Sequence, residues 1–123
     1  MQKSTENWVI TLLQSIDRQD VDAFASYLAE DVVFKFGNAD PISGKQAVAQ
    51  VVQGFFNSIK DLRHELVDIW IDENDVICRG VVTYTRIDSS TLSVPFANFF
   101  RLGGELIADY QIYVDISELY QVA

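Results

Sequence analysis

The chain has 123 residues, 49% of them hydrophobic, which fits one folded domain with a substantial core and excludes an intrinsically disordered chain. Its formal net charge of −9 opposes binding to nucleic acid or to an anionic membrane surface, because both require clustered Lys and Arg. The polar start resembles no signal peptide and no apolar run approaches the roughly 20 residues of a membrane span, so we expect a cytoplasmic protein.

Two helices are predicted at the start of the chain. Ser4 or Thr5 can cap the first helix, and Asp20 can cap the second, which would end at Glu30 and Asp31. Both helices carry apolar residues at helical spacing: Trp8, Leu12, Leu13 and Ile16 in the first, and Val21, Phe24, Tyr27 and Leu28 in the second.

A short strand and a third helix follow. Residues 32–36 have the composition of a strand, and residues 37–41 that of a loop. Ser43 would start the helix, in which Gly54 suggests close packing against another element. The apolar stripe of this helix consists of Val48, Val51, Val52, Phe55 and Ile59.

The second half of the chain has the period of two that is typical of strands. Four strands are predicted at residues 62–71, 76–87, 92–102 and 106–115, with short turns between them. Residues 116–120 would add a last helical turn. This order predicts an α+β fold in which the helices lie across one face of an antiparallel sheet.

The last strand alternates most clearly. Its predicted core face consists of Leu106, Ala108, Tyr110, Ile112 and Val114, and its other face of Ile107, Asp109, Gln111, Tyr113 and Asp115. On the strand before it, Asn98 interrupts an apolar face, and a buried amide must be hydrogen-bonded. Its partner would be a ligand carbonyl, or else backbone or water.

Three segments resemble the SnoaL-like family of the nuclear transport factor 2-like superfamily: AEDVVF at 29–34, ISGKQAV at 42–48 and GELIADYQIYVD at 104–115. The superfamily includes ketosteroid isomerases, limonene epoxide hydrolases and polyketide cyclases. The resemblance implies a cystatin-like conical barrel, with three N-terminal helices packed on a curved, mainly antiparallel sheet. It also implies one domain over residues 1–123, a pocket that needs no cofactor, and a homodimer formed through the outer sheet face.

The positions that carry catalysis in cyclases and epoxide hydrolases hold other residues here. The resemblance places Ile112 at their acidic position on the last strand. It places Val81 and Thr83 at the Arg and Asp of the epoxide hydrolases, and Phe34 and Phe36 at their Tyr and Asn. The usual catalytic carboxylates of these enzymes are therefore missing.

The isomerase positions differ in the same way. Phe36, or Lys35 with a shift of one residue, stands where isomerases have their carboxylate base. Leu12 falls near their Tyr donor, and Asn98 near their acidic oxyanion donor. The remaining candidates for a catalytic group are Asp109, Tyr110 and Asn98, although the alternation places Asp109 on the outer face.

We expect an apolar pocket in which Thr83, Asn98 and Tyr110 orient the ligand. The predicted lining consists of Trp8, Leu12, Tyr27, Phe34, Phe36, Phe55, Val81, Thr83, Phe96, Asn98, Tyr110 and Ile112. Arg101, on the outer face, would pair with Asp109 or Asp88.

Neither a metal nor a cofactor is expected. His64 is the only histidine and is expected on the surface, and residues 72–75 resemble a solvated turn more than a cation loop. Cys78, the only cysteine, excludes an internal disulfide and is expected to be a buried, inert thiol.

Three functions remain open. The first is a domain that binds a hydrophobic small molecule, and the second a cofactor-independent isomerase, cyclase or hydratase that acts on a hydrophobic substrate. The third is a protein-interaction module that uses the outer sheet face. The direction of the Asp109 side chain, an open pocket and the oligomeric state would distinguish them.

Overall fold

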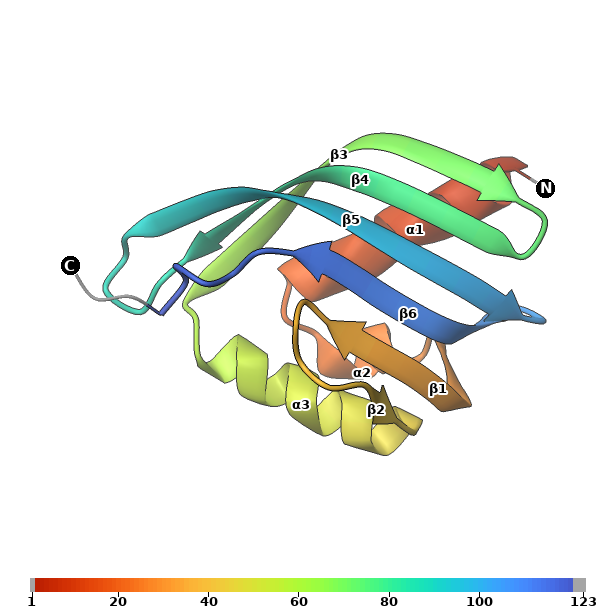
Figure 1. Ribbon diagram of the computed structural model, residues 1–123, viewed down its shortest axis with the longest axis horizontal. Helices are drawn as coiled ribbons and strands as arrows, with labels where there is room; N and C mark the ends of the chain where they lie inside the picture. Colours follow the sequence, from red (N-terminus) through yellow and green to blue (C-terminus); the bar gives the residue numbers. More distant parts are fainter. Residues whose placement is uncertain (1, 121–123) are drawn as a thin grey trace.

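A computed structural model describes the backbone of residues 2–120 and the side chains of residues 8–120 (Figure 1). The helices are α1 (Gln2–Asp17), α2 (Val21–Ala25) and α3 (Lys45–Asn57). The strands are β1 (Leu28–Phe36), β2 (Ile42–Ser43), β3 (Asp61–Asp72), β4 (Asp75–Thr85), β5 (Thr91–Gly103) and β6 (Leu106–Val114). No helix in this part of the chain is long and apolar enough to cross a membrane.

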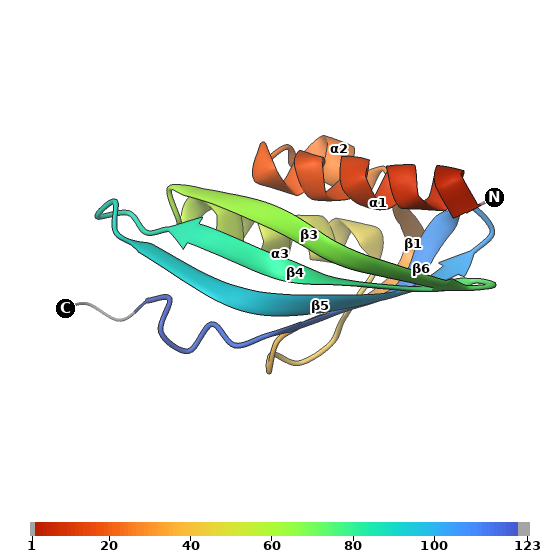
Figure 2. The same cartoon turned by 90° about the horizontal axis from the view of Figure 1, so that it is seen from above.

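One six-stranded sheet has the order β2-β1-β6-β5-β4-β3. Only the β1–β6 pair is parallel, so β3 to β6 form the predicted antiparallel meander. Figure 2 shows all three helices on one side of the curved sheet, which does not close into a full barrel. The predicted α+β fold, with three helices packed on a curved and mainly antiparallel sheet, is confirmed.

The second helix is shorter than predicted. Asp20 caps it as expected, because its Oδ1 accepts the backbone N–H three residues further on, at 3.1 Å. The helix has only 5 residues, however, and β1 already begins at Leu28. Leu28 pairs with Ile107, whose N–H donates to the carbonyl of Tyr27 at 2.9 Å. This long-range pairing outweighs the helical spacing, so residues 30–31 lie inside a strand.

The first and third helices start at other residues than predicted. The backbone of α1 is helical from Gln2, and the side chains of Ser4 and Thr5 lie outside the described ones. Ser43 belongs to β2, where it pairs with Val33, and does not cap α3. The chain turns into α3 at Gly44, whose φ of 99° suits glycine.

Gly54 does not pack closely against another element, contrary to expectation. It is exposed, and a Cβ added there would meet nothing within 4 Å. Gly54→Ala should therefore raise the free energy of unfolding by about 0.5–1 kcal/mol, since glycine weakens a helix interior. Urea denaturation tests this, with Gly104→Ala as control, because Gly104 also has free space but a φ of 68°. Loss of stability in Gly54→Ala would contradict the prediction.

A bulge at Ala108 breaks the predicted alternation of β6. Ile107 is 1% exposed and Leu106 39% exposed, the reverse of the predicted faces. Ala108 has no partner on β5, where the register shifts, and one extra residue exchanges the two faces of a strand. From Asp109 onward the predicted faces hold, with Tyr110 inside the core.

Where a last helical turn was predicted at residues 116–120, the chain forms a single turn, in which the N–H of Leu119 donates to the carbonyl of Ile116 at 2.9 Å. Arg86 holds this turn against the sheet. Its Nε donates to the carbonyl of Leu119 at 2.8 Å, and its Nη2 to that of Glu118 at 3.0 Å. The Leu119 side chain is fully buried and belongs to the hydrophobic core.

Candidate functional site

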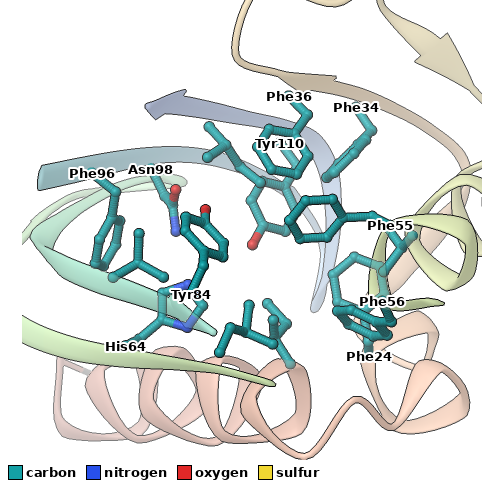
Figure 3. Close-up of a pocket in the computed structure, with 15 residues that line it drawn as sticks. Phe24, Phe34, Phe36, Phe55, Phe56, His64, Tyr84, Phe96, Asn98 and Tyr110 are labelled. Carbon is teal, nitrogen blue, oxygen red and sulfur yellow. The ribbon is translucent and has the colours of Figure 1, made fainter. Parts of the chain in front are cut away.

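A pocket lies between the helices and the inner face of the sheet, with a free volume of about 40 Å³ (Figure 3). That is room for a small chemical group or a few water molecules. Every helix, and every strand except β2, contributes to its wall. The lining consists of Ile16, Phe24, Phe34, Phe36, Val52, Phe55, Phe56, Leu62, His64, Val82, Tyr84, Phe96, Asn98, Tyr110 and Ile112.

Aromatic rings in edge-to-face contact build one wall of this pocket. Phe36 lies against Phe34 and Phe55, with ring centroids 6.4 and 4.9 Å apart. The ring of Phe55 also contacts that of Tyr84, with centroids 5.9 Å apart. The ring of Phe34 contacts that of Tyr110, with centroids 5.3 Å apart. Such contacts fix ring orientation as well as burying apolar area. The wall is therefore apolar and offers few polar contacts.

Two polar side chains in the lining have a buried atom without a hydrogen-bond partner among the described residues. They are Asn98, through Oδ1, and Tyr110, through its hydroxyl. Asn98 is 2% exposed and Tyr110 fully buried, and Figure 3 shows the Tyr110 hydroxyl directed into the pocket. An unsatisfied buried group costs about 1–3 kcal/mol. Both atoms are therefore available to a molecule in the pocket.

Burial also keeps the Tyr110 hydroxyl in its neutral form. Removal from water is the main reason why its pKa lies far above the usual value, and the nearby Cys78 and Tyr84 act in the same direction. The hydroxyl therefore remains a hydrogen-bond donor over the whole neutral and mildly alkaline range. The amide of Asn98 can both donate and accept, so the pair offers complementary hydrogen bonds to a neutral molecule.

The expectation that His64 lies on the surface is wrong. Its side chain is 11% exposed and lines the pocket, edge-on to the ring of Phe96 with centroids 5.1 Å apart. Nδ1 of His64 lies 2.6 Å from Oδ1 of Asp17, and the backbone N–H donates to both oxygens of that carboxylate at 3.2 and 3.1 Å. The sequence did contain one indication of this position: His64 alternates with Leu62 and Leu66 along β3, so the three side chains share the inner face.

Several predicted lining residues do lie in the pocket. They come from β1, α3, β5 and β6, and are Phe34, Phe36, Phe55, Phe96, Asn98, Tyr110 and Ile112. Ile112 therefore occupies the position at which the resemblance implies an acid, and Phe34 and Phe36 occupy two further catalytic positions. Their side chains leave an apolar surface there.

The predicted lining residues of β4 face the wrong way. Val81 is 39% exposed, and the hydroxyl of Thr83 lies 2.8 Å from that of Ser93 on the outer face. Val82 and Tyr84 take their places in the pocket. A shift of one residue reverses the face of a strand, and the apolar pair at 81–82 does not reveal which residue points inward.

Three other predicted lining residues are not in the pocket wall. Leu12 is fully buried in the core. Trp8 packs edge-on against Phe100 at 5.2 Å and lies 6.5 Å from Tyr27. The hydroxyl of Tyr27 donates to Thr11 on α1 at 2.8 Å, so Tyr27 fastens α1 and does not contact the pocket.

Asp109 lies outside the pocket lining, opposite Arg101 on the outer face of β5 and β6. Arg101 pairs with neither predicted partner, because its Nε donates to Oδ1 of Asp75 at 2.8 Å. The ion pair lowers the pKa of Asp75 and raises that of Arg101. Asp88 instead accepts from the N–H and the hydroxyl of Ser90 in its own turn.

Cys78 is fully buried, as predicted, and burial raises the pKa of its thiol to about 12. Since the thiolate is the nucleophile, we expect iodoacetamide at neutral pH to leave Cys78 unmodified in the folded protein. Mass spectrometry should detect one added carbamidomethyl group only after unfolding in urea, and rapid labelling of the native protein would contradict this. Residues 8–120 contain no group of three His, Cys, Asp or Glu side chains that could hold a metal ion.

Comparison with known proteins identifies the class of domain. A family model described as "SnoaL-like domain" matches residues 9–110, which is most of the chain. The chain therefore belongs to the SnoaL-like family, and the resemblance inferred from the sequence is confirmed. A search of curated protein sequences finds no match.

Solved structures with the same fold include several kinds of protein. A putative polyketide cyclase from Xanthomonas campestris is 23% identical, with a TM-score of 0.78 over 93% of this chain and 92% of its own. An epoxide hydrolase from M. tuberculosis is 15% identical, with a TM-score of 0.77 over 91% and 83%. A hypothetical protein from Catenulispora acidiphila, solved in complex with trimethylamine, is 16% identical, with a TM-score of 0.81 over 89% and 85%. At these identities the similarity shows the fold alone.

Proposed function

We propose that this domain binds a small, neutral organic molecule in the aromatic pocket. The observation that carries the proposal is the pair of unpartnered polar atoms, Asn98 Oδ1 and the Tyr110 hydroxyl, buried in a mostly apolar wall. Each unpaired buried atom lowers the stability of the fold, so apolar side chains would be more stable at both positions if nothing bound there. A ligand with an apolar body and one donor and one acceptor group satisfies both.

The free volume sets the size of the first ligands to try. About 40 Å³ admits a small group directly, and a whole ring needs a side chain to move. Phe55 is the candidate for that movement, since it is only half-buried and stands on the last turn of α3. Single-ring compounds such as phenol, cyclohexanone and 2-pyridone are therefore the appropriate probes.

Tyr110→Phe provides the sharpest test of the binding site. Removing the unpartnered hydroxyl should raise the free energy of unfolding by about 1 kcal/mol and weaken binding of 2-pyridone about tenfold, because one hydrogen bond to the ligand is lost. Chemical denaturation measures the first effect, and NMR titration the second. An unchanged affinity would contradict the proposal.

The matched control for this test is Tyr27→Phe. It makes the same chemical change outside the pocket, at a hydroxyl that donates to Thr11 at 2.8 Å. We expect this variant to lose about 1 kcal/mol of stability and to keep full affinity for the probe. The two tyrosine variants should therefore change stability with opposite signs.

We further propose that the protein is a homodimer through the outer sheet face. Apolar side chains gather there on neighbouring strands, since Trp70 pairs with Ile77, and Ile77 with Phe99. Tyr113 adds to them on β6 and is 59% exposed. Apolar patches of this kind mark interaction surfaces. Sedimentation tests this proposal, which predicts a dimer for the wild type and a folded monomer for Trp70→Glu. A wild-type monomer would instead favour the protein-interaction module.

A further inference from the structure

His64 and Asp17 form a carboxylate–imidazole pair at the pocket. The two residues are 47 positions apart and come from the end of α1 and the start of β3. Asp17 is held by three contacts to His64, two from the backbone N–H and one from the ring. The neighbouring ring of Phe96 stands nearly perpendicular to the imidazole, at 87°. Contacts on two sides therefore fix the orientation of the imidazole.

This arrangement determines which ring nitrogen carries the proton of the neutral imidazole. Nδ1 lies 2.6 Å from a carboxylate oxygen, which can only accept, so Nδ1 carries a proton and donates a hydrogen bond to Asp17. In the neutral ring the lone pair is then on Nε2. Among the described residues, hydrogen bonds to His64 involve only its backbone nitrogen and Nδ1, so Nε2 remains available as a proton acceptor.

We infer that the pocket is a proton-transfer site in which Nε2 of His64 is the base and Asp17 positions the ring. This inference rests on the proposed binding function. The substrates it predicts are neutral molecules with a flat apolar body and an acidic C–H or O–H bond beside a hydrogen-bond acceptor. Figure 3 shows His64, Tyr84, Asn98 and Tyr110 around one space, so one bound molecule can reach both the base and the donors.

The step balances without a cofactor. Nε2 takes the proton of the bound molecule, and the electron pair of the broken bond stays on that molecule. The imidazolium that forms is stabilised by the Asp17 carboxylate, and the negative charge that develops on the substrate accepts a hydrogen bond from the Tyr110 hydroxyl. The proton returns to another atom of the product, or leaves to water.

The base elimination of 5-nitrobenzisoxazole tests this inference directly. The base removes the proton on C3, the C–H electron pair completes a nitrile, and the N–O bond breaks to give a coloured nitrophenolate. We expect His64→Gln and Asp17→Asn each to lower kcat/KM at least tenfold, since a positioned base contributes a factor of about 100 or more. Asp68→Asn changes a carboxylate that pairs with Arg79 at 2.7 Å on the outer face, and it should leave the rate unchanged. All rates are repeated in a Phe55→Ala background, which widens the pocket for this probe.

A second readout separates a base from a merely structural histidine. His64 is the only histidine, so its ¹⁵N NMR signals need no assignment by mutation. In spectra of the neutral ring we expect the proton on Nδ1 in the wild type, and we expect Asp17→Asn to lose that preference. Wild-type spectra with the proton on Nε2 would overturn the inference.

A probe that binds but cannot react distinguishes failure of the proton-transfer inference from failure of the binding proposal. 5-Nitroindole has a similar shape but no N–O bond in its ring, so it cannot undergo the elimination and reports binding alone by NMR titration. If it binds and His64→Gln eliminates as fast as the wild type, the proton-transfer site is refuted and the pocket stands. If the wild type and Phe55→Ala bind neither 5-nitroindole nor the single-ring probes, and neither protein eliminates, both proposals are refuted.

Discussion

Gly80→Ala is expected to destabilise the protein by about 3 kcal/mol or more, the largest effect of a single methyl group that we predict. A Cβ on Gly80 would stand 2.0 Å from the carbonyl oxygen of Glu65, and 3.0 and 3.1 Å from Glu65 C and Leu66 Cα. All three are backbone atoms of β3, so no side chain can turn away to make room. The clash lies where the register of β3 shifts and Val67 is left without a partner on β4.

Chemical denaturation measures this effect, and Gly54→Ala is the matched control. The same methyl group is added in both variants, but in open space at Gly54 and against backbone at Gly80. The two variants should therefore move the denaturation midpoint in opposite directions. A Gly80→Ala protein within 1 kcal/mol of the wild type would mean that β3 and β4 can separate without loss, and that the close approach is not needed.

The four strands of the meander were predictable because their side chains alternate and short polar turns separate them. What alternation cannot reveal is an extra residue in a strand. Ala108 and Val67 are ordinary strand residues, yet each lacks a partner and changes the face of its neighbours. The assignment of β6 therefore failed only before the bulge, at Leu106 and Ile107, and succeeded after it.

At the pocket, too, the sequence predicted some residues and missed others, because strand pairing cannot be read from local spacing. Phe96 and Asn98 were predicted correctly because their face of the strand is apolar at every other position from Leu92 to Leu102, whereas the other face includes Ser93 and Arg101. On β4, Val81 and Val82 are equally apolar, and only pairing with β3 and β5 decides which one points inward. The chemistry of His64 depends on Asp17, which is 47 residues away, and no local pattern joins them. Local spacing therefore predicted the wall of the pocket but not the hydrogen bond between His64 and Asp17.

Asp17→Ala should be the second most damaging substitution, at about 2–3 kcal/mol. It removes the only hydrogen-bond acceptor that the structure shows for the backbone N–H of His64 and for Nδ1, and it leaves both groups unpaired in a partly buried place. Asp20→Ala is the natural comparison, since it removes one contact of 3.1 Å at a helix N-cap and should cost about 1 kcal/mol.

Asp17→Asn separates the two effects of this carboxylate. The amide oxygen still accepts a hydrogen bond, so we expect this variant to recover at least half of the stability that Asp17→Ala loses. It carries no charge, however, and cannot stabilise an imidazolium at His64. Recovered stability with impaired elimination is therefore the expected combination. If Asp17→Asn has both the recovered stability and the wild-type elimination rate, the carboxylate only holds α1 against β3. The charge of Asp17 then has no part in the chemistry of the pocket.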